Sequence, residues 1–211
     1  MQKEIIQIQL ALFFKEIYKD DFEKISLNLK SKLGSSAKTL IPPIPEEAPD
    51  EIPRLSLFFE DFNINVGRNR LDIFTVDNDK LQEVLKKVHE SNLGIEITRI
   101  GFVKTYFIDG NIETIKPLLN DRLKQLDIND LRLRINKQST IQERMCNNIE
   151  SLNIGSITTT ENKEDVNKSG LIITKDINHI PQKEVTLSKE NQVEIVKAFD
   201  LESNTLSLIT E

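Results

Sequence analysis

The stretch "IIQIQLALFF", residues 5–14, alternates strongly apolar side chains with polar or other ones from its second position onward. Successive side chains of a strand point to opposite faces, so this period of two predicts a β-strand with one apolar face. Gln7 and Gln9 interrupt the run and no small-residue cleavage site follows, which argues against a signal peptide. The expected apolar face comprises Ile6, Ile8, Leu10, Leu12 and Phe14.

Directly after this strand the apolar spacing becomes helical. Apolar residues recur every three or four positions through residues 15–33, and Gly34 stands where a helix C-cap belongs. The first unit is therefore predicted to be a strand followed by a helix. The residues of the helical stripe are Tyr18, Phe22, Ile25, Leu29 and Leu33.

The following segments are predicted to continue this alternation. A hairpin of two strands precedes a helix that Asp77 can cap, and Ser188 can cap the last helix. Pro117 is expected to weaken or bend the helix that contains it. The polar stretch 158–170 is predicted to be a loop. In chain order the elements are strands 54–67 and 68–76, a helix after 77, strand 95–109, helix 111–126, strands 130–136 and 170–178, helix 188–200 and a short strand in 204–210.

Strands that arrive in adjacent pairs favour an α+β fold with a mainly antiparallel sheet and helices on one face. The order strand, helix, strands, helix occurs twice, which raises the hypothesis of two similar halves, residues 1–93 and 94–211. Only "ESNLG", residues 90–94, lies where they meet, too short for an independent linker. We therefore expect one compact body.

Residues 39–53, "TLIPPIPEEAPDEIP", hold five of the chain's seven prolines. Proline fixes backbone angles and disfavours helix before it, so the segment is interpreted as a stiff crossing inside the first half. The spacing of Pro42 and Pro45 also suits a polyproline-binding groove on another protein. No adjacent basic residue supplies the usual anchor for such docking, so the structural interpretation is favoured.

Composition limits the classes of function. The chain has 211 residues, 28 basic and 34 acidic side chains, and a net charge of -6. An acidic balance argues mildly against a broad nucleic-acid surface. One cysteine excludes an internal disulfide, and no apolar run reaches the length of a membrane span, so a cytoplasmic protein is expected. The sequence has no glycine-rich phosphate loop, so no nucleotide or other cofactor is predicted.

Four arginines form the candidate ligand or phosphate site. Arg68 and Arg70 bracket the predicted hairpin turn, and Arg132 and Arg134 share one face of a strand because they are two residues apart. Guanidinium groups bind phosphate or carboxylate well. The alternative is that these arginines pair with acids on neighbouring strands, for example Glu96 or Asp72.

Other reactive side chains are sparse. Asp61 and Asp72 fall on neighbouring predicted strands and would suit a Mg²⁺ site if they met on one face. Asp77 and Asp79 are better explained as helix-terminus residues. Cys146 with His89 or His179 leaves a nucleophilic pair formally open, although a lone cysteine is more often a buried apolar residue. No metal site is predicted from these residues.

The runs 52–74 and 97–109, with the late strand "GLIITKDIN" and the later "VKAFD", resemble a sporadically distributed bacterial family of uncharacterised α+β proteins. Arg99-Ile100-Gly101 and Asp176 stand at the places that match the family pattern. The resemblance implies an α+β fold and no established activity. The patchy occurrence of that family suggests a connection with mobile or defence-associated genes.

These observations favour a non-enzymatic protein-interaction or regulatory module that binds a protein partner or associates with itself. Outward apolar residues such as Phe13, Phe58 and Phe59 suit an interface. Nucleic-acid binding through the four arginines is the first alternative. A metal-dependent hydrolase that uses Asp61 and Asp72 is the second.

Overall fold

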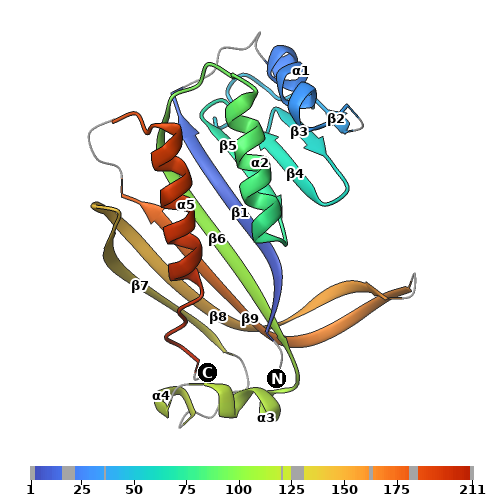
Figure 1. The fold of residues 1–211 in the computed structure, drawn as a ribbon. Coiled ribbons are helices and arrows are strands. Elements are labelled where there is room, and N and C mark those ends of the chain that lie inside the picture. The colour runs from blue at the N-terminus through green and yellow to red at the C-terminus, as the bar shows by residue number, and fades with distance from the viewer. Residues whose placement is uncertain are drawn as a thin grey trace.

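The computed structural model describes residues 3–15, 22–35, 37–119, 121–124, 131–161, 164–180 and 185–209. Its centre is an antiparallel sheet with the strand order β2-β3-β4-β5-β1-β6-β9-β8-β7 (Figure 1). The strands are β1 (Glu4–Phe14), β2 (Lys38–Leu40), β3 (Leu55–Phe58), β4 (Phe62–Val66), β5 (Arg70–Thr75), β6 (Ile97–Asp109), β7 (Arg132–Ile141), β8 (Arg144–Glu161) and β9 (Glu164–His179).

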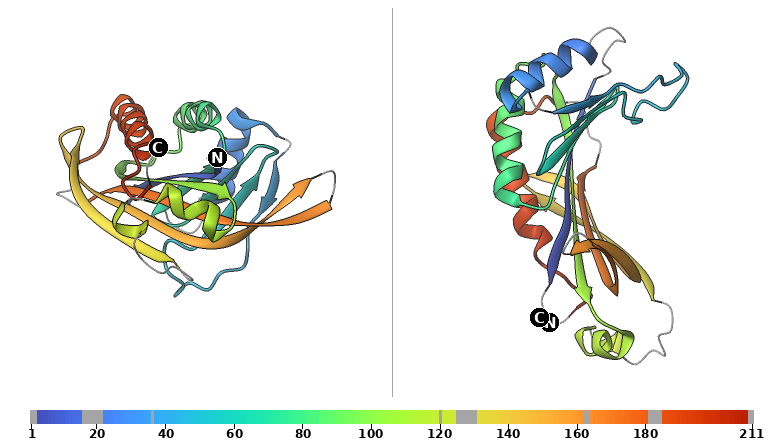
Figure 2. Two further views of the ribbon diagram at one scale, coloured as in Figure 1. Left: turned by 90° about the horizontal axis from the view of Figure 1, so that it is seen from below. Right: turned by 90° about the vertical axis from the view of Figure 1, so that its right-hand side faces the viewer.

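Helices accompany this sheet, so the predicted α+β class with mainly antiparallel strands is confirmed. Figure 2 shows α1, α2 and α5 over one face of the sheet, while α3 and α4 lie beyond one end. No described helix combines the length and apolar character needed to cross a membrane. The helices are α1 (Phe22–Leu33), α2 (Asn78–Glu90), α3 (Ile112–Ile115), a 3-10 helix (Lys116–Leu118), α4 (Asp121–Lys124) and α5 (Lys189–Ser203).

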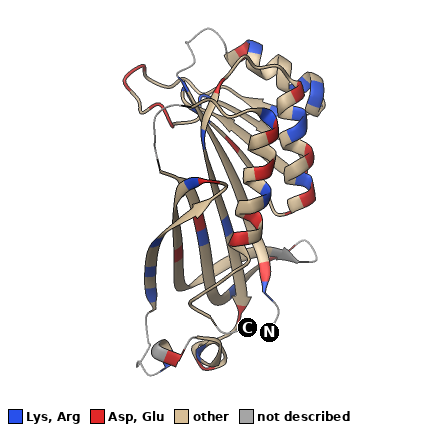
Figure 3. Cartoon of the chain, turned by 60° about the vertical axis from the view of Figure 1, so that its left-hand side comes forward, with Lys and Arg blue, Asp and Glu red and all other residues tan. Residues whose placement is uncertain are grey.

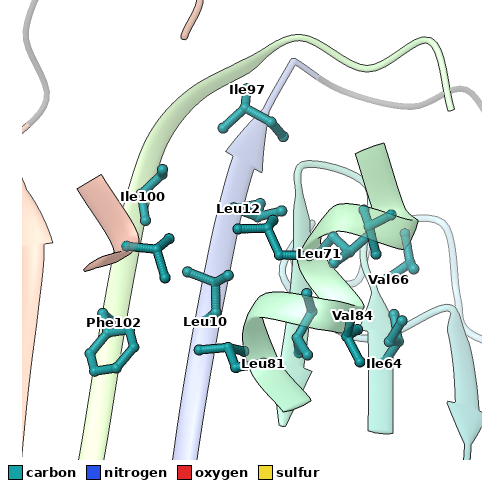
Figure 4. Packing of buried hydrophobic residues seen from close by; sticks show 14 of the residues in the cluster. Leu10, Leu12, Ile64, Val66, Leu71, Leu81, Val84, Ile97, Ile100 and Phe102 are labelled. Carbon is teal, nitrogen blue, oxygen red and sulfur yellow. The ribbon is translucent and has the colours of Figure 1, made fainter. Parts of the chain in front are cut away.

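The apolar face of β1 forms the centre of the main core. Leu10 lies beside Leu81 of α2 and Leu12 beside Leu71 of β5 (Figure 4), and both are almost completely buried. A register shift between Ile5 and Gln7 interrupts the alternation, so Ile6 does not join the buried cluster as the sequence predicts. The period-two pattern therefore holds for β1 from Ile8 onward.

Helix ends agree with the capping residues expected from the sequence. The Asp77 carboxylate accepts hydrogen bonds from the backbone N–H groups of Asp79 and Lys80, and Ser188 accepts one from Asn191. Gly34 has a φ of 121°, a backbone conformation that glycine adopts readily, and its N–H donates to Lys30. Tyr18, placed in the first helical stripe, lies outside the described residues.

Several segment predictions are wrong. The single strand predicted over 54–67 is two strands, β3 and β4, separated by a turn in which the Phe59 N–H donates to the Phe62 carbonyl. Of the strand predicted in 204–210, the described residues form only an isolated bridge between Ile209 and Leu119.

Residues 158–170 are not a loop, because β8 and β9 continue as a hairpin in which Thr158 pairs with Asn167. This hairpin extends past the rest of the sheet (Figure 1), so polar side chains can occupy both of its faces. The helix predicted over 111–126 is instead α3, a 3-10 turn and α4, because Pro117 lacks the N–H that a continuous helix requires.

The proline-rich segment joins β2 to β3, which are antiparallel neighbours. Buried Arg54 donates from its guanidinium to the carbonyl groups of Ile44, Pro45 and Ala48, at 3.3–3.5 Å. A Cβ on Gly67 would lie 2.5 Å from the carbonyl oxygen of Asp50, so the segment approaches the β4–β5 turn too closely for a larger residue. These contacts hold the segment against its own domain.

Charged side chains are buried between the sheet and α5. Lys104 Nζ lies 2.8 Å from Asp200 Oδ1 of α5, and Lys175 Nζ lies 3.3 Å from Glu150 Oε2. Glu150 also accepts hydrogen bonds from the N–H groups of Ser207 and Leu208 and from the Ser207 hydroxyl, at 2.8–3.0 Å. Glu150 thus ties the segment after α5 to the sheet.

We predict that Glu150→Ala lowers the free energy of unfolding by about 3–5 kcal/mol, because it leaves the ammonium of Lys175 buried without its carboxylate. Urea denaturation measures this change. Glu194→Ala, at an exposed position of α5, is the matched control and should change stability by less than about 1 kcal/mol. A loss for Glu150→Ala no larger than that of the control would contradict the anchoring role.

Candidate binding surface on the open face of the sheet

The sheet face opposite α1, α2 and α5 is called the open face here. It carries the alternate residues of each strand, which are mainly amides, hydroxyls and charged groups. Register places Ala11 of β1 between Asp72 of β5 and Gly101 of β6, and Gly101 opposite Asn178 of β9. The open face is therefore mainly polar from β3 to β7, with apolar side chains such as Phe13, Phe74 and Val103 among the polar ones.

The four predicted arginines do not form one stripe. Arg70 begins β5 and Arg68 precedes it, whereas Arg132 and Arg134 belong to β7 at the edge of the sheet. Five strand spacings separate β5 from β7, which is about 24 Å. The structure therefore divides the predicted site into two separate pairs.

Arg68 and Arg70 make contacts within the chain. Arg68 lies 3.6 Å from Asp50 and donates to the carbonyl oxygen of Glu46 at 3.1 Å. Arg70 donates through Nε and Nη2 to Asp72 Oδ1 at 2.8 and 2.7 Å. Arg70 therefore pairs with an acid, as the alternative interpretation expects, although Asp72 lies on the same strand and not on a neighbouring one.

Arg132 and Arg134 are exposed, and within the described ranges neither has a hydrogen bond or ion pair. Their cross-strand neighbours on β8 are Asn153 and Ser151, not acids. Glu96, the acid considered as a partner, accepts a hydrogen bond from Thr186 instead. A shallow depression of about 390 Å³ lies along these residues, so the β7 pair remains accessible.

A second cationic site, which the sequence did not indicate, lies on the central strands. Phe13 of β1 pairs with Arg70 on one side and with Arg99 of β6 on the other. The Arg99 guanidinium carbon is 3.7 Å from the centre of the Phe13 ring, and that of Arg70 is 5.1 Å away. Asp72 accepts from Gln9 as well as from Arg70. These residues form the Phe13 cluster: Gln9, Phe13, Arg70, Asp72 and Arg99.

Electrostatics distinguish the two arginines of the Phe13 cluster. Arg70 has a carboxylate partner, whereas Arg99 has neither an ion pair nor a hydrogen bond to its guanidinium among the described residues. Burial, and then the positive charge of Arg70, lower the pKa of Arg99, while the more distant Glu51 opposes this shift. Arg99 is a half-buried cation without a counterion in the chain.

The structure does not bring Asp61 and Asp72 together. Phe62 pairs with Thr75 and Asn65 with Asp72, so Asp61 lies about four residues, or about 13 Å, along the strands from Asp72. Two-metal sites hold their ions only about 4 Å apart. Asp61 instead contacts Lys80 at 2.9 Å. This separation does not support a hydrolase built on the pair.

The other described residues do not assemble a metal site or an activated nucleophile either. Over the described ranges no group of three or more potential ligands could hold a metal ion. Cys146 and His179 are cross-strand partners on the covered face, yet the thiol donates to the carbonyl of Arg144, not to the imidazole. Burial raises the pKa of Cys146 to about 11, so the thiol stays protonated and poorly nucleophilic.

The aromatic residues predicted to face outward differ in their surroundings. Phe58 is 39% exposed, whereas Phe59 stacks on Phe62 with ring centres 4.2 Å apart. Phe13 is half-buried beneath the arginines that contact it. Only Phe58 is thus freely exposed.

Fold and surface together define an antiparallel α+β protein with one helix-covered face and one mainly polar face that carries arginines. The chain matches no family model, and no curated protein matches it as a relative.

The buried histidine on the covered face predicts a pH dependence of stability. Burial, and then the nearby charges of Arg144 and Arg99, lower the pKa of His179 to about 4 from 6.5. Above pH 6.5 the imidazole is neutral in both the folded and the unfolded chain. As the pH falls toward 4 the unfolded chain binds the proton first, so the protein loses about 3 kcal/mol of stability.

Urea denaturation between pH 7 and pH 4 tests this assignment. His179→Gln should show about 3 kcal/mol less acid destabilisation than the unmodified protein. His89→Gln is the comparison variant, because burial lowers the pKa of His89 too, while its hydrogen bond to Gln192 at 2.9 Å opposes that shift, so this variant should relieve less of the acid destabilisation than His179→Gln. Identical pH profiles for the unmodified protein and His179→Gln would refute the role of His179.

Proposed function

We propose that the protein is a non-enzymatic interaction module that binds an acidic, extended segment of a partner protein along β7. The observation that carries this proposal is that β7 ends the sheet. It has ten residues and one strand neighbour, β8, so its alternate backbone N–H and C=O groups point away from the sheet. An extended peptide can pair with such an edge as an added strand.

Charge supports an acidic partner. Arg132, Arg134 and Lys137 give β7 three positive charges and no negative one, although the whole chain has a net charge of -6 (Figure 3). None of the three has an ion-pair partner among the described residues. Carboxylates of an added strand would face these cations across the new ladder.

The same charges disfavour self-association at this edge. Two copies that paired through β7 would bring six positive charges and no negative one to the same pair of strands, and such an accumulation of like charge is unfavourable. A partner protein is therefore proposed in preference to a second copy of the chain.

Nucleic acid is the competing ligand for a basic strand. Three charges on an acidic chain are few, and β7 has no aromatic side chain on which a base could stack. Protein binding is therefore favoured, and the experiment includes the nucleic acid.

Fluorescence anisotropy with defined probes tests the proposal. A labelled peptide of alternating glutamate and valine, as long as β7, should bind the unmodified protein at least about tenfold more tightly than the variant Arg132→Glu/Arg134→Glu. The corresponding lysine–valine peptide should not bind. Lys24→Glu/Lys32→Glu makes the same charge change at exposed positions of α1 and should bind like the unmodified protein.

Two outcomes would reject the proposal. Equal affinity of the glutamate peptide for both double variants would show attraction to overall charge instead of to β7. Binding of a single-stranded oligonucleotide with a steep salt dependence, lost in the β7 variant while the peptide fails to bind, would favour the nucleic-acid alternative.

We also retain two broader proposals. The cytoplasm is supported by the single thiol, which is buried and unpaired. The two similar halves are supported by strand order, because β1 pairs with β5, β5 with β4 and β4 with β3, as β6 pairs with β9, β9 with β8 and β8 with β7.

A further inference from the structure

The charges of the Phe13 cluster do not balance. Arg70 and Asp72 neutralise one another at 2.7–2.8 Å, and Gln9 supplies a neutral donor to the same carboxylate. Arg99 adds one positive charge that no carboxylate of the described residues neutralises. Keeping two guanidinium groups near one another in a partly desolvated position is unfavourable unless something compensates.

Phe13 holds the Arg99 guanidinium in position. The 3.7 Å separation places the cation over the ring, where the negative face of the π system attracts it. The backbone of Phe13 is fixed by its pairing with both neighbouring strands, and Thr98 Oγ1 donates to its carbonyl at 3.4 Å. A guanidinium that lies over a ring keeps its N–H groups at its edges, where an acceptor can reach them.

We infer that the Phe13 cluster is a carboxylate-binding site in which Arg99 is the principal ligand-binding residue. Arg70 and Asp72 show the same recognition within the chain, and a carboxylate is the planar acceptor that matches a guanidinium in two-point hydrogen bonding. The surplus of one positive charge suits a monoanion better than a phosphate dianion. The ligand is therefore the carboxylate of a small acid or of a glutamate or aspartate side chain.

A carboxylate of the chain itself borders this site. Glu51, in the proline-rich segment, acts on the pKa of Arg99 at a distance but forms no ion pair with it. Glu51 is exposed and would repel an incoming anion. The site does not depend on β7, because three strand spacings, about 14 Å, separate β6 from the edge strand.

Side-chain NMR of the full chain tests the inference. Acetate, titrated against chloride at constant ionic strength, should shift the Arg99 Nε–H resonance in a saturable manner. Inorganic phosphate at equal ionic strength should bind more weakly. Arg99→Lys keeps the charge but loses the planar donor edge, so the acetate-dependent shifts of the neighbouring Phe13 and Thr98 signals should become linear and small.

Two further variants make the result decisive. Arg132→Gln/Arg134→Gln should leave the acetate response unchanged, because those arginines lie at the sheet edge. Glu51→Gln should tighten acetate binding about twofold to fivefold by removing a competing negative charge. A tripeptide with a central glutamate that binds more tightly than acetate identifies a protein side chain as the ligand, and the reverse order identifies a small acid.

The inference would be overturned by a non-saturating acetate response in the unmodified protein, or by an equal response in Arg99→Lys. Preference for phosphate over acetate would also reject the carboxylate assignment. Because these measurements do not involve β7, their failure leaves the proposed edge-strand function untouched, and failure of the peptide experiment leaves this site untouched.

Discussion

The antiparallel pairing of β1 with β6 is the contact on which the rest of the fold depends. It runs from Glu4 opposite Phe107 to Phe14 opposite Ile97 and joins β2 to β5 on one side with β7 to β9 on the other. The same pairing aligns Leu10 with Phe102 and Leu12 with Ile100 on the covered face. If the two strands separated, each side of the sheet would expose a long edge of unpaired backbone N–H and C=O groups.

This pairing also separates two chemical environments, because successive side chains of each strand point to opposite faces of the sheet. Residues whose side chains point to the same face of the sheet as Leu10 lie under the helices and are removed from water. They include Lys104 and its cross-strand partner Lys175. Residues on the same face as Gln9 point away from the helices, where Arg70 and Arg99 stay partly exposed although Ala11 is buried. A one-residue slip of β1 would exchange the two faces, so the apolar side chains that fix the core also fix where the arginines of the open face lie.

Local patterns predicted the fold well where one face of an element is apolar and one is polar. The strand at 5–14, the caps Asp77 and Ser188, and the α+β class follow from such patterns. The hairpin of β8 and β9 was missed because its distal part is polar on both faces and has no buried side to produce a signal. The Phe13 cluster was missed because Phe13, Arg70 and Arg99 meet only through strand order, which no local window contains.

Comparison with other buried cations of the chain shows that Arg99 lacks a hydrogen-bond acceptor for its guanidinium among the described residues. Lys104 is neutralised by Asp200, and Lys175 by Glu150. Arg54 donates from both Nη atoms to backbone carbonyl groups, although its buried Nε has no hydrogen-bond partner among the described residues. Arg99 has neither kind of acceptor among the described residues, and an aromatic ring alone does not use its N–H groups. Because each of the other three cations has at least one acceptor from elsewhere in the chain, the unused donors of Arg99 argue for an acceptor from outside it.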